Sequence, residues 1–143
     1  EGKATTADGT EVGTDTATTR RVISEDAATQ MTHMMERVVD PEVGVAPAAV
    51  VPGYRIAGKT GTAQRVGAEC GCYDGTFTVS FAGFAPADDP RFTIYVVVQN
   101  PRAANSFGAT VAAPVFHDLM AAALQKYGVP PTGHPAPILP TTW

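Results

Sequence analysis

The chain has 143 residues, of which 44% are hydrophobic and 17% are charged, and its formal net charge is −4. A chain of this length fits one domain and can bury roughly two thirds of its unfolded surface, which suffices for a hydrophobic core. The acidic balance provides no basic patch, which excludes nucleic acid as an expected partner, and no apolar run approaches the roughly 18 residues of a transmembrane helix.

The first segment, residues 1–23, is polar and rich in Thr. Asp8-Gly9 stands between Thr-rich flanks and is typical of a hairpin turn. We therefore expect a polar surface hairpin or a flexible segment here, and we assign no chemistry to it.

Ser24 begins the first predicted helix, which ends at Val39 before Asp40-Pro41. A Ser side chain caps free backbone amides at a helix start, and Asp-Pro stops a helix. The spacing predicts an apolar face toward the core and a polar face toward solvent. The expected apolar face holds Ala27, Ala28, Met31, Met34, Met35, Val38 and Val39, and the expected polar face holds Gln30, His33, Glu36 and Arg37.

An irregular connection, 41–52, leads into the stretch Tyr54–Gln64, whose first residues alternate in polarity as in a strand. Gly58-Lys59-Thr60-Gly61-Thr62 then places one cation and two hydroxyls beside two residues that lack a Cβ atom. The cation and the hydroxyls suit an anion, and the glycines let the backbone of a ligand approach the strand. The stretch is therefore the predicted edge of an anion-binding site.

The run Gly53–Thr60 also satisfies Gly-x4-Gly-Lys-Thr, the phosphate-binding loop of nucleotide hydrolases. That loop requires a buried strand before it and a helix that begins at its Lys. Here Val50-Val51-Pro52 precedes the pattern, and glycines without an apolar helical stripe follow it. A later apolar strand ends in Gln99-Asn100, where a magnesium-binding acidic residue would be needed. A phosphate-binding loop is therefore the less favoured interpretation.

Residues 65–75 form the predicted loop after this strand and contain both cysteines of the chain, Cys70 and Cys72. The two are too close for an ordinary disulfide and too few for a structural zinc site. A strained bridge, two free thiols and a pairing with another chain all stay open, and no metal role is expected.

Two strands are predicted next, 76–81 and 92–98, because apolar and polar residues alternate in both. The turn between them holds Asp88 and Asp89, which are more typical of a turn than of a pair of catalytic carboxylates. Together with the Lys59 strand, this hairpin predicts a three-stranded antiparallel meander.

A second helix is predicted over residues 112–127, and it is terminated by Gly128 followed by Pro130. His117 and Asp118 are adjacent, so their side chains diverge around the helix and do not form a catalytic pair. The residues beyond it, 128–143, are rich in Pro and predict an extended surface segment. The expected buried face of the helix holds Val115, Phe116, Leu119, Met120, Ala123, Leu124 and Tyr127.

The run Ala-Gly-Lys-Thr-Gly-Thr-Ala-Gln that ends at Gln64 resembles the third motif of class B, monofunctional penicillin-binding protein transpeptidases. Phe81–Pro86 and Ala113–Phe116 support this resemblance. Cys-Gly-Cys-Tyr at 70–73 resembles the division-specific type of actinobacteria, the FtsI or penicillin-binding protein 3 type. The resemblance implies an α+β fold: the C-terminal part of the transpeptidase fold that penicillin-binding proteins share with serine β-lactamases, with an antiparallel sheet of three strands packed against helices.

By the same resemblance, the whole chain is expected to be a C-terminal fragment of a transpeptidase domain, with its helices and meander in 24–127. In the family, the nucleophile is the Ser of Ser-x-x-Lys, and Ser-x-Asn supplies a second motif. Ser24, Ser80 and Ser106 fit neither pattern. The nucleophilic Ser is therefore expected on an upstream segment, and this chain alone is expected to be inactive.

For the intact enzyme, the resemblance implies a serine-type D-Ala-D-Ala transpeptidase that cross-links peptidoglycan at the septum and is acylated by β-lactams. The implied site residues are Lys59, Thr60, Gly61 and Thr62. Lys59 would hydrogen-bond the second motif, and the hydroxyls of Thr60 and Thr62 would bind the substrate carboxylate. The Thr62 backbone N–H would stabilise the oxyanion, and Gly61 would keep the strand edge open.

The implied partners are peptidoglycan stem peptides, β-lactam antibiotics, the upstream part of the same domain, and division proteins such as an FtsW-type glycosyltransferase. No cofactor is implied. The expected location is the extracytoplasmic face of the bacterial membrane, with the anchor outside this chain, where Cys70 and Cys72 could be oxidised. The alternatives, beside the phosphate-binding loop, are a serine β-lactamase or β-lactam sensor and a non-catalytic interaction module.

Overall fold

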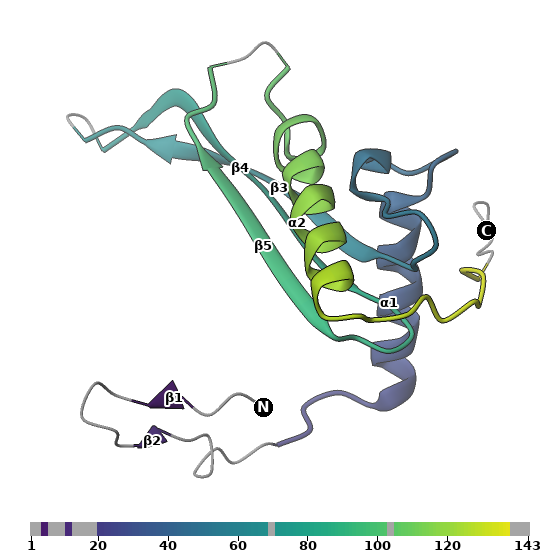
Figure 1. Ribbon diagram of the computed structural model, residues 1–143. Helices are drawn as coiled ribbons and strands as arrows, with labels where there is room; N and C mark the ends of the chain where they lie inside the picture. The colour runs from purple at the N-terminus through teal and green to yellow at the C-terminus, as the bar shows by residue number, and fades with distance from the viewer. Residues whose placement is uncertain (1–3, 6–10, 13–19, 69–70, 103–104, 138–143) are drawn as a thin grey trace.

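The computed structural model describes residues 4–5, 11–12, 20–68, 71–102 and 105–137. Figure 1 shows a three-stranded sheet with one helix lying across it and another helix to one side. In chain order, the elements are β1 (Ala4–Thr5), β2 (Glu11–Val12), α1 (Glu25–Val39), η1 (Pro47–Ala49), β3 (Ala57–Val66), β4 (Tyr73–Ala85), β5 (Phe92–Gln99), η2 (Gly108–Ala112) and α2 (Ala113–Lys126).

The sheet has the strand order β3-β4-β5, and both pairings are antiparallel, which confirms the predicted meander. Its first hairpin is longer than the sequence pattern indicated, because β3 continues to Val66 and β4 begins at Tyr73. Pairing resumes there beyond an irregularity after Gln64, with Val66 opposite Tyr73. β3 begins at Ala57. Residues 54–56 therefore lie before the strand, and the prediction from their alternation that they belong to it is wrong.

The core lies between the sheet and α2. The ring centroids of Phe81 on β4 and Phe116 on α2 are 4.8 Å apart, and both side chains are fully buried. Each such Phe contributes roughly 1.5–3 kcal/mol by leaving water. The buried core cluster consists of Val39, Ala46, Ala49, Val51, Ile56, Phe81, Ala85, Val96, Ala112, Ala113, Phe116, Met120 and Leu124.

The buried stripe of α2 is narrower than the sequence predicts. Val115, Leu119 and Tyr127 are 43%, 50% and 67% exposed, so their expected place in the core is wrong. The helix rests on a single sheet face, and only one line of side chains at three- and four-residue spacing is covered. That line consists of Ala113, Phe116, Met120 and Leu124.

The first helix begins as predicted, because Ser24 Oγ accepts a hydrogen bond from the Ala27 backbone N at 3.1 Å. Its expected faces are partly wrong. Met31 and Met34 are 52% and 50% exposed, whereas Glu36, assigned to the solvent face, is only 5% exposed. The reason is tertiary: the end of α1 packs beside the start of β3, where Glu36 finds a cationic partner.

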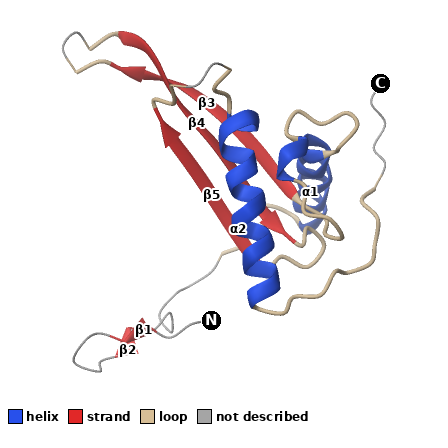
Figure 2. Ribbon diagram, turned by 45° about the horizontal axis from the view of Figure 1, so that its top comes forward, coloured by secondary structure: helices blue, strands red, loops and turns tan. Residues whose placement is uncertain are grey.

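The described parts of the two terminal segments are a short strand pair before α1 and an extended tail after α2. β1 and β2 pair antiparallel with Ala4 opposite Val12, while the predicted Asp8-Gly9 turn lies outside the described residues. After α2, the tail runs as a loop toward the side on which α1 lies, as Figure 2 shows, and Tyr54 Oη donates a 2.6 Å hydrogen bond to the Val129 carbonyl.

Neither helix in the described part of the chain has the length and apolarity needed to cross a bilayer.

Candidate active site

The Lys59 motif lies in β3, at one edge of the sheet. Among the described strands, β3 pairs with β4 alone, so no described strand occupies its second edge. Lys59 lies opposite Ala82 and Thr62 opposite Val79, in continuous antiparallel register. The motif is therefore inside a strand, and the helix start that a phosphate-binding loop requires at Lys59 is not found at this position.

All four predicted site residues are accessible: Lys59 and Thr62 are exposed, and Thr60 and Gly61 are partly exposed. Lys59 Nζ donates hydrogen bonds to the Thr60 carbonyl O at 2.8 Å and to Thr60 Oγ1 at 3.2 Å. None of the described carboxylates forms an ion pair with Lys59. The strand edge thus carries an accessible positive charge beside two hydroxyls.

The glycines of the motif are also required for packing inside the sheet. A Cβ on Gly58 would collide with the buried ring of Phe81, and a Cβ on Gly61 would lie 2.5 Å from Ser80 Oγ. The sequence alone suggests that these glycines serve to let a ligand approach the strand. Their position against β4 adds a second physical reason for them.

A further segment, η2, reaches the motif although no sequence signal placed it there. A Cβ on Gly108 would lie 3.2 Å from Thr60 Cβ and 3.1 Å from the Gly61 carbonyl O. The connection from β5 to α2 therefore borders the motif. A glycine before a helix was the sole sequence hint, and by itself it is weak.

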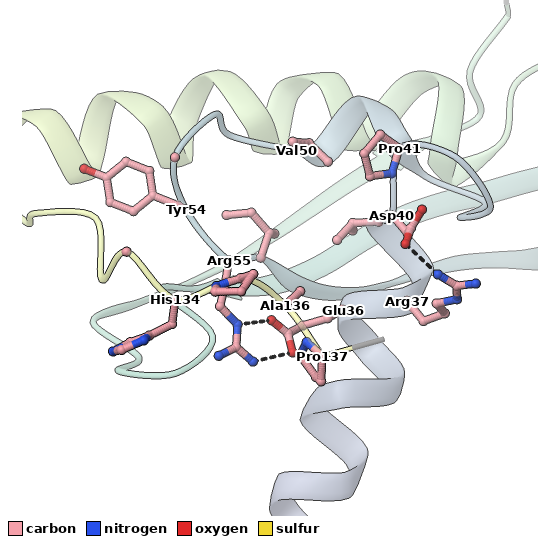
Figure 3. A pocket seen from close by; sticks show the side chains of 15 residues that line it. Glu36, Arg37, Asp40, Pro41, Val50, Tyr54, Arg55, His134, Ala136 and Pro137 are labelled. Atoms are coloured by element: carbon pink, nitrogen blue, oxygen red, sulfur yellow. Dashed lines mark hydrogen bonds and ion pairs between the residues drawn. The ribbon is translucent and has the colours of Figure 1, made fainter. Parts of the chain in front are cut away.

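A second cluster of charged side chains lies just before β3 and is centred on Arg55 (Figure 3). Arg55 Nε and Nη2 donate hydrogen bonds to the two carboxylate oxygens of Glu36 at 2.6 and 2.8 Å. Arg55 Nη1 lies 3.6 Å from Asp88 Oδ2. The hydrogen bond with Glu36 raises the pKa of the Arg55 guanidinium above its ordinary value.

Asp88 lies between β4 and β5, as the turn prediction requires, but it also belongs to this cluster. Burial is the largest single influence on the pKa of Asp88, and it opposes ionisation. Hydrogen bonds from the Thr132 side chain and the backbone, together with the charges of Arg55 and His134, outweigh burial and hold the pKa of the Asp88 carboxyl below its ordinary value. The carboxylate is thus ionised and tied to both Arg55 and the tail.

A cavity of about 490 Å³ opens beside the Arg55 cluster, between the end of α1, the segment before β3 and the tail. Figure 3 shows its charged side chains in two pairs, Arg55 with Glu36 and Arg37 with Asp40. No residue of the Lys59 motif lines this cavity. Its main charged groups neutralise one another, so the exposed charge of Lys59 remains the better candidate for binding an anion.

The other residues considered from the sequence have structural contacts. His117 Nδ1 donates a 2.6 Å hydrogen bond to the Val50 carbonyl and so fixes the segment around η1 against α2. Cys72 is disulfide-bonded, and Cys70 lies outside the described residues. Over the ranges that the structure describes, no group of three His, Cys, Asp or Glu side chains could hold a metal ion.

Comparison with known families agrees with this geometry. Residues 5–121 match the family described as the penicillin binding protein transpeptidase domain. The chain belongs to this family. The family expected from the Lys-Thr-Gly motif is therefore confirmed.

Individual penicillin-binding proteins are similar over most of the chain. It is 45% identical over 126 residues to penicillin-binding protein PbpB of Mycolicibacterium smegmatis, which covers 83% of this chain and 19% of that protein. It is 42% identical over 111 residues to peptidoglycan D,D-transpeptidase FtsI of Escherichia coli, covering 78% of this chain and 18% of that protein. The chain thus spans about a fifth of the length of the curated relatives it matches.

Solved penicillin-binding proteins have the same fold. Penicillin-binding protein 3 of Mycobacterium tuberculosis, in complex with ampicillin, is similar with a TM-score of 0.71 and 38% identity, over 93% of this chain and 31% of that chain. The transpeptidase domain of Burkholderia pseudomallei penicillin-binding protein 3 gives a TM-score of 0.71 at 36% identity, over 85% of this chain and 37% of that chain. These similarities confirm the predicted α+β transpeptidase fold.

Proposed function

We propose that this chain supplies the Lys-Thr-Gly-Thr strand of a serine D,D-transpeptidase that cross-links peptidoglycan during septal wall synthesis. The observation that carries the proposal is the place of Lys59, exposed on the edge strand in a chain of the transpeptidase family. An extended peptide can add to such an edge through backbone hydrogen bonds. A cation beside that edge suits the carboxylate of a D-Ala-D-Ala terminus.

In this proposal, the nucleophile comes from an upstream part of the parent protein, because no serine of the chain lies in a Ser-x-x-Lys motif. The Ser oxygen adds to the carbonyl carbon of the penultimate D-Ala, and the peptide bond to the terminal D-Ala breaks. The proton of the Ser hydroxyl leaves on the amine of the released D-Ala. An amine of a neighbouring strand then displaces the Ser, forms the new peptide bond and returns a proton to the Ser oxygen.

Each residue of the Lys-Thr-Gly-Thr motif has a separate proposed role. Lys59 hydrogen-bonds the Ser of the Ser-x-Asn motif, and the hydroxyls of Thr60 and Thr62 bind the carboxylate of the substrate or antibiotic. The Thr62 backbone N–H stabilises the oxyanion, a contact whose loss raises the barrier by roughly 3 kcal/mol. The exposure of Lys59 and Thr62 and the edge of β3 that no described strand occupies support these roles.

The substrates and location are proposed on the same basis. Stem peptides ending in D-Ala-D-Ala are the natural acyl donors, and β-lactams acylate the same Ser. Structures of a relative in complex with ampicillin and aztreonam support the binding of β-lactams. The site works on the extracytoplasmic face of the membrane beside an FtsW-type glycosyltransferase, and relatives named FtsI and PbpB favour a transpeptidase over a β-lactamase or sensor.

Intact-mass spectrometry after incubation with benzylpenicillin tests the proposal, on this chain alone and on the complete parent protein. We expect a covalent adduct on the parent alone, at a Ser outside the chain. An adduct on Ser24, Ser80, Ser106 or a cysteine of this chain would contradict the assignment of the nucleophile. An unreactive parent would favour a non-catalytic module.

A further inference from the structure

Arg55 joins three elements at the entrance to β3. Its side chain makes a two-pronged ion pair with Glu36 of α1, at 2.6 and 2.8 Å, and lies 3.6 Å from Asp88 in the turn between β4 and β5. Its backbone carbonyl accepts a 2.8 Å hydrogen bond from Ala87 N in the same turn. Both the side chain and the backbone of Arg55 are thus held by residues distant in sequence.

The ion pairs of this cluster are shielded from water. The side chains of Arg55, Glu36 and Asp88 are only 15%, 3% and 17% exposed. A planar guanidinium that pairs with both oxygens of a carboxylate fixes direction as well as distance, which a Lys ammonium does not. Removing one partner also leaves a charge without compensation in a poorly solvated place. The cluster therefore favours one geometry.

A short, buried segment connects this cluster to Lys59. Ile56, Ala57 and Gly58, the residues that separate it from Arg55, are buried, and a close-packed interior leaves little room for a shift. The hydrogen bonds of the Lys59 side chain within the described residues go to its neighbour Thr60. Lys59 is consequently placed by the backbone of β3, which β4 holds along one edge and the Arg55 cluster holds at its start.

We infer that Arg55 is a positioning residue for acyl transfer: its ion pairs with Glu36 and Asp88 set where β3 presents Lys59 and Thr62. The inference rests on the proposed function. A misplacement of about 1 Å in a reacting group can lower a rate about 100-fold. A small shift at the start of β3 is enough to lower the rate, because the strand transmits the shift directly to Lys59.

The experiment uses the complete parent enzyme with two substitutions. Arg55→Gln removes the charge, and Arg55→Lys keeps the charge but loses the planar guanidinium that pairs with both carboxylate oxygens. Arg37→Gln is the matched control, because it breaks a different ion pair at the end of the same helix, Arg37 with Asp40, in which Arg55 takes no part. Acylation by a fluorescent penicillin gives three quantities: the burst amplitude, the rate constant of the covalent step, and the dissociation constant of the preceding complex.

We expect Arg55→Gln to slow the covalent step roughly 30- to 100-fold and Arg55→Lys about tenfold, while the dissociation constant changes less than about threefold. Arg37→Gln should stay within about twofold of the wild type. A merely structural role would reduce the burst amplitude and leave the rate constant of the competent molecules unchanged. That outcome would overturn the inference.

A double-mutant comparison adds a second criterion. Glu36→Gln should slow the covalent step, but less than Arg55→Gln, which also loses the ion pair with Asp88. The double variant should be little slower than Arg55→Gln, because the interaction between Arg55 and Glu36 is lost in all three. Fully additive losses would contradict a shared positioning role. The proposed function is tested separately: a wild-type parent that penicillin does not acylate, or a Lys59→Ala variant acylated at the normal rate, would remove that function and this inference with it.

Discussion

Arg55 and Lys59 carry the same charge close together in the sequence, yet their surroundings differ. The Arg55 side chain is 15% exposed and paired with Glu36, whereas Lys59 is exposed and bonds to Thr60. Breaking a buried pair leaves its partner uncompensated, while an exposed Lys can change with little effect on folding. Substitutions at the two positions should therefore separate effects on catalysis from effects on stability.

Lys59→Ala and Thr62→Ala should each abolish penicillin acylation of the complete enzyme without unfolding it. We expect the acylation rate constant to fall at least about 100-fold, because Lys59→Ala removes the proposed hydrogen bond to the Ser-x-Asn motif and Thr62→Ala removes a hydroxyl proposed to position the carboxylate of the antibiotic. The unfolding free energy should change by less than about 0.5 kcal/mol, since both side chains are exposed. Lys126→Ala, an exposed lysine on α2, is the control, and an unaltered acylation rate in either variant would contradict the site assignment.

Asp88→Asn should reduce the loss of unfolding free energy that occurs as the pH falls from 7 to 3. Hydrogen bonds and the charge of Arg55 outweigh burial and hold the pKa of Asp88 below its ordinary value of 3.8, so the ionised form stabilises the fold. That contribution is complete above the unfolded pKa and is lost as the pH falls through the lower folded pKa. Urea unfolding at pH 7 and pH 3 should show a larger loss in the wild type than in Asp88→Asn.

The adjacent variant Asp89→Asn serves as the control for removing a charge from the same turn. It should lose stability between the two pH values as the wild type does. If Asp88→Asn behaves in the same way as Asp89→Asn, the ionised Asp88 carboxylate, with its hydrogen bonds and its ion pair to Arg55, does not contribute to stability.

At the scale of elements, the sequence predicts what local periodicity can encode. Both helices, their ends and the antiparallel meander follow from spacing, caps and alternation, and the Lys59 motif follows from its residue types. The same periodicity assigns Glu36 to solvent, because a pattern along one helix contains no information about a partner such as Arg55 on another element. It also cannot show that η2 borders Thr60, since only the folded chain brings the two together.

Gly58→Ala and Gly61→Ala form a matched pair in one strand. A Cβ at Gly58 would meet the buried ring of Phe81, which packs against Phe116 and cannot move aside. A Cβ at Gly61 would meet only the hydroxyl of Ser80, which can rotate. We expect Gly58→Ala to destabilise the domain by about 2–3 kcal/mol and Gly61→Ala by less than about 1 kcal/mol.

Thermal unfolding of the complete protein measures this difference. Ser80→Ala should relieve the remaining cost of Gly61→Ala, because it removes the hydroxyl that the new Cβ meets. Equal destabilisation at Gly58 and Gly61 would show that the close contact with Phe81 does not govern the need for glycine.

At the scale of the whole molecule, apolar side chains remain exposed where the described core does not reach. Met31 and Met34 on α1 are 52% and 50% exposed, and Tyr95 and Val97 on β5 are 66% and 43% exposed. Tyr95 and Val97 flank the buried Val96, so they lie on the sheet face opposite to α2. Because the chain spans about a fifth of its curated relatives, we expect the rest of a parent domain to cover these surfaces.

Methionine oxidation tests this expectation within a single chain. In the isolated chain, hydrogen peroxide should oxidise Met31 and Met34 rapidly, whereas Met120, which is 0% exposed, should react slowly. In the complete parent, Met31 and Met34 should become at least about tenfold slower, because burial restricts access of the oxidant to the sulfur. Met120 is the internal control, since its environment between α2 and the sheet should be the same in both proteins. Equal rates for Met31 and Met34 in both proteins would show that this side of α1 faces solvent in the complete enzyme, and that its apolar side chains require another explanation.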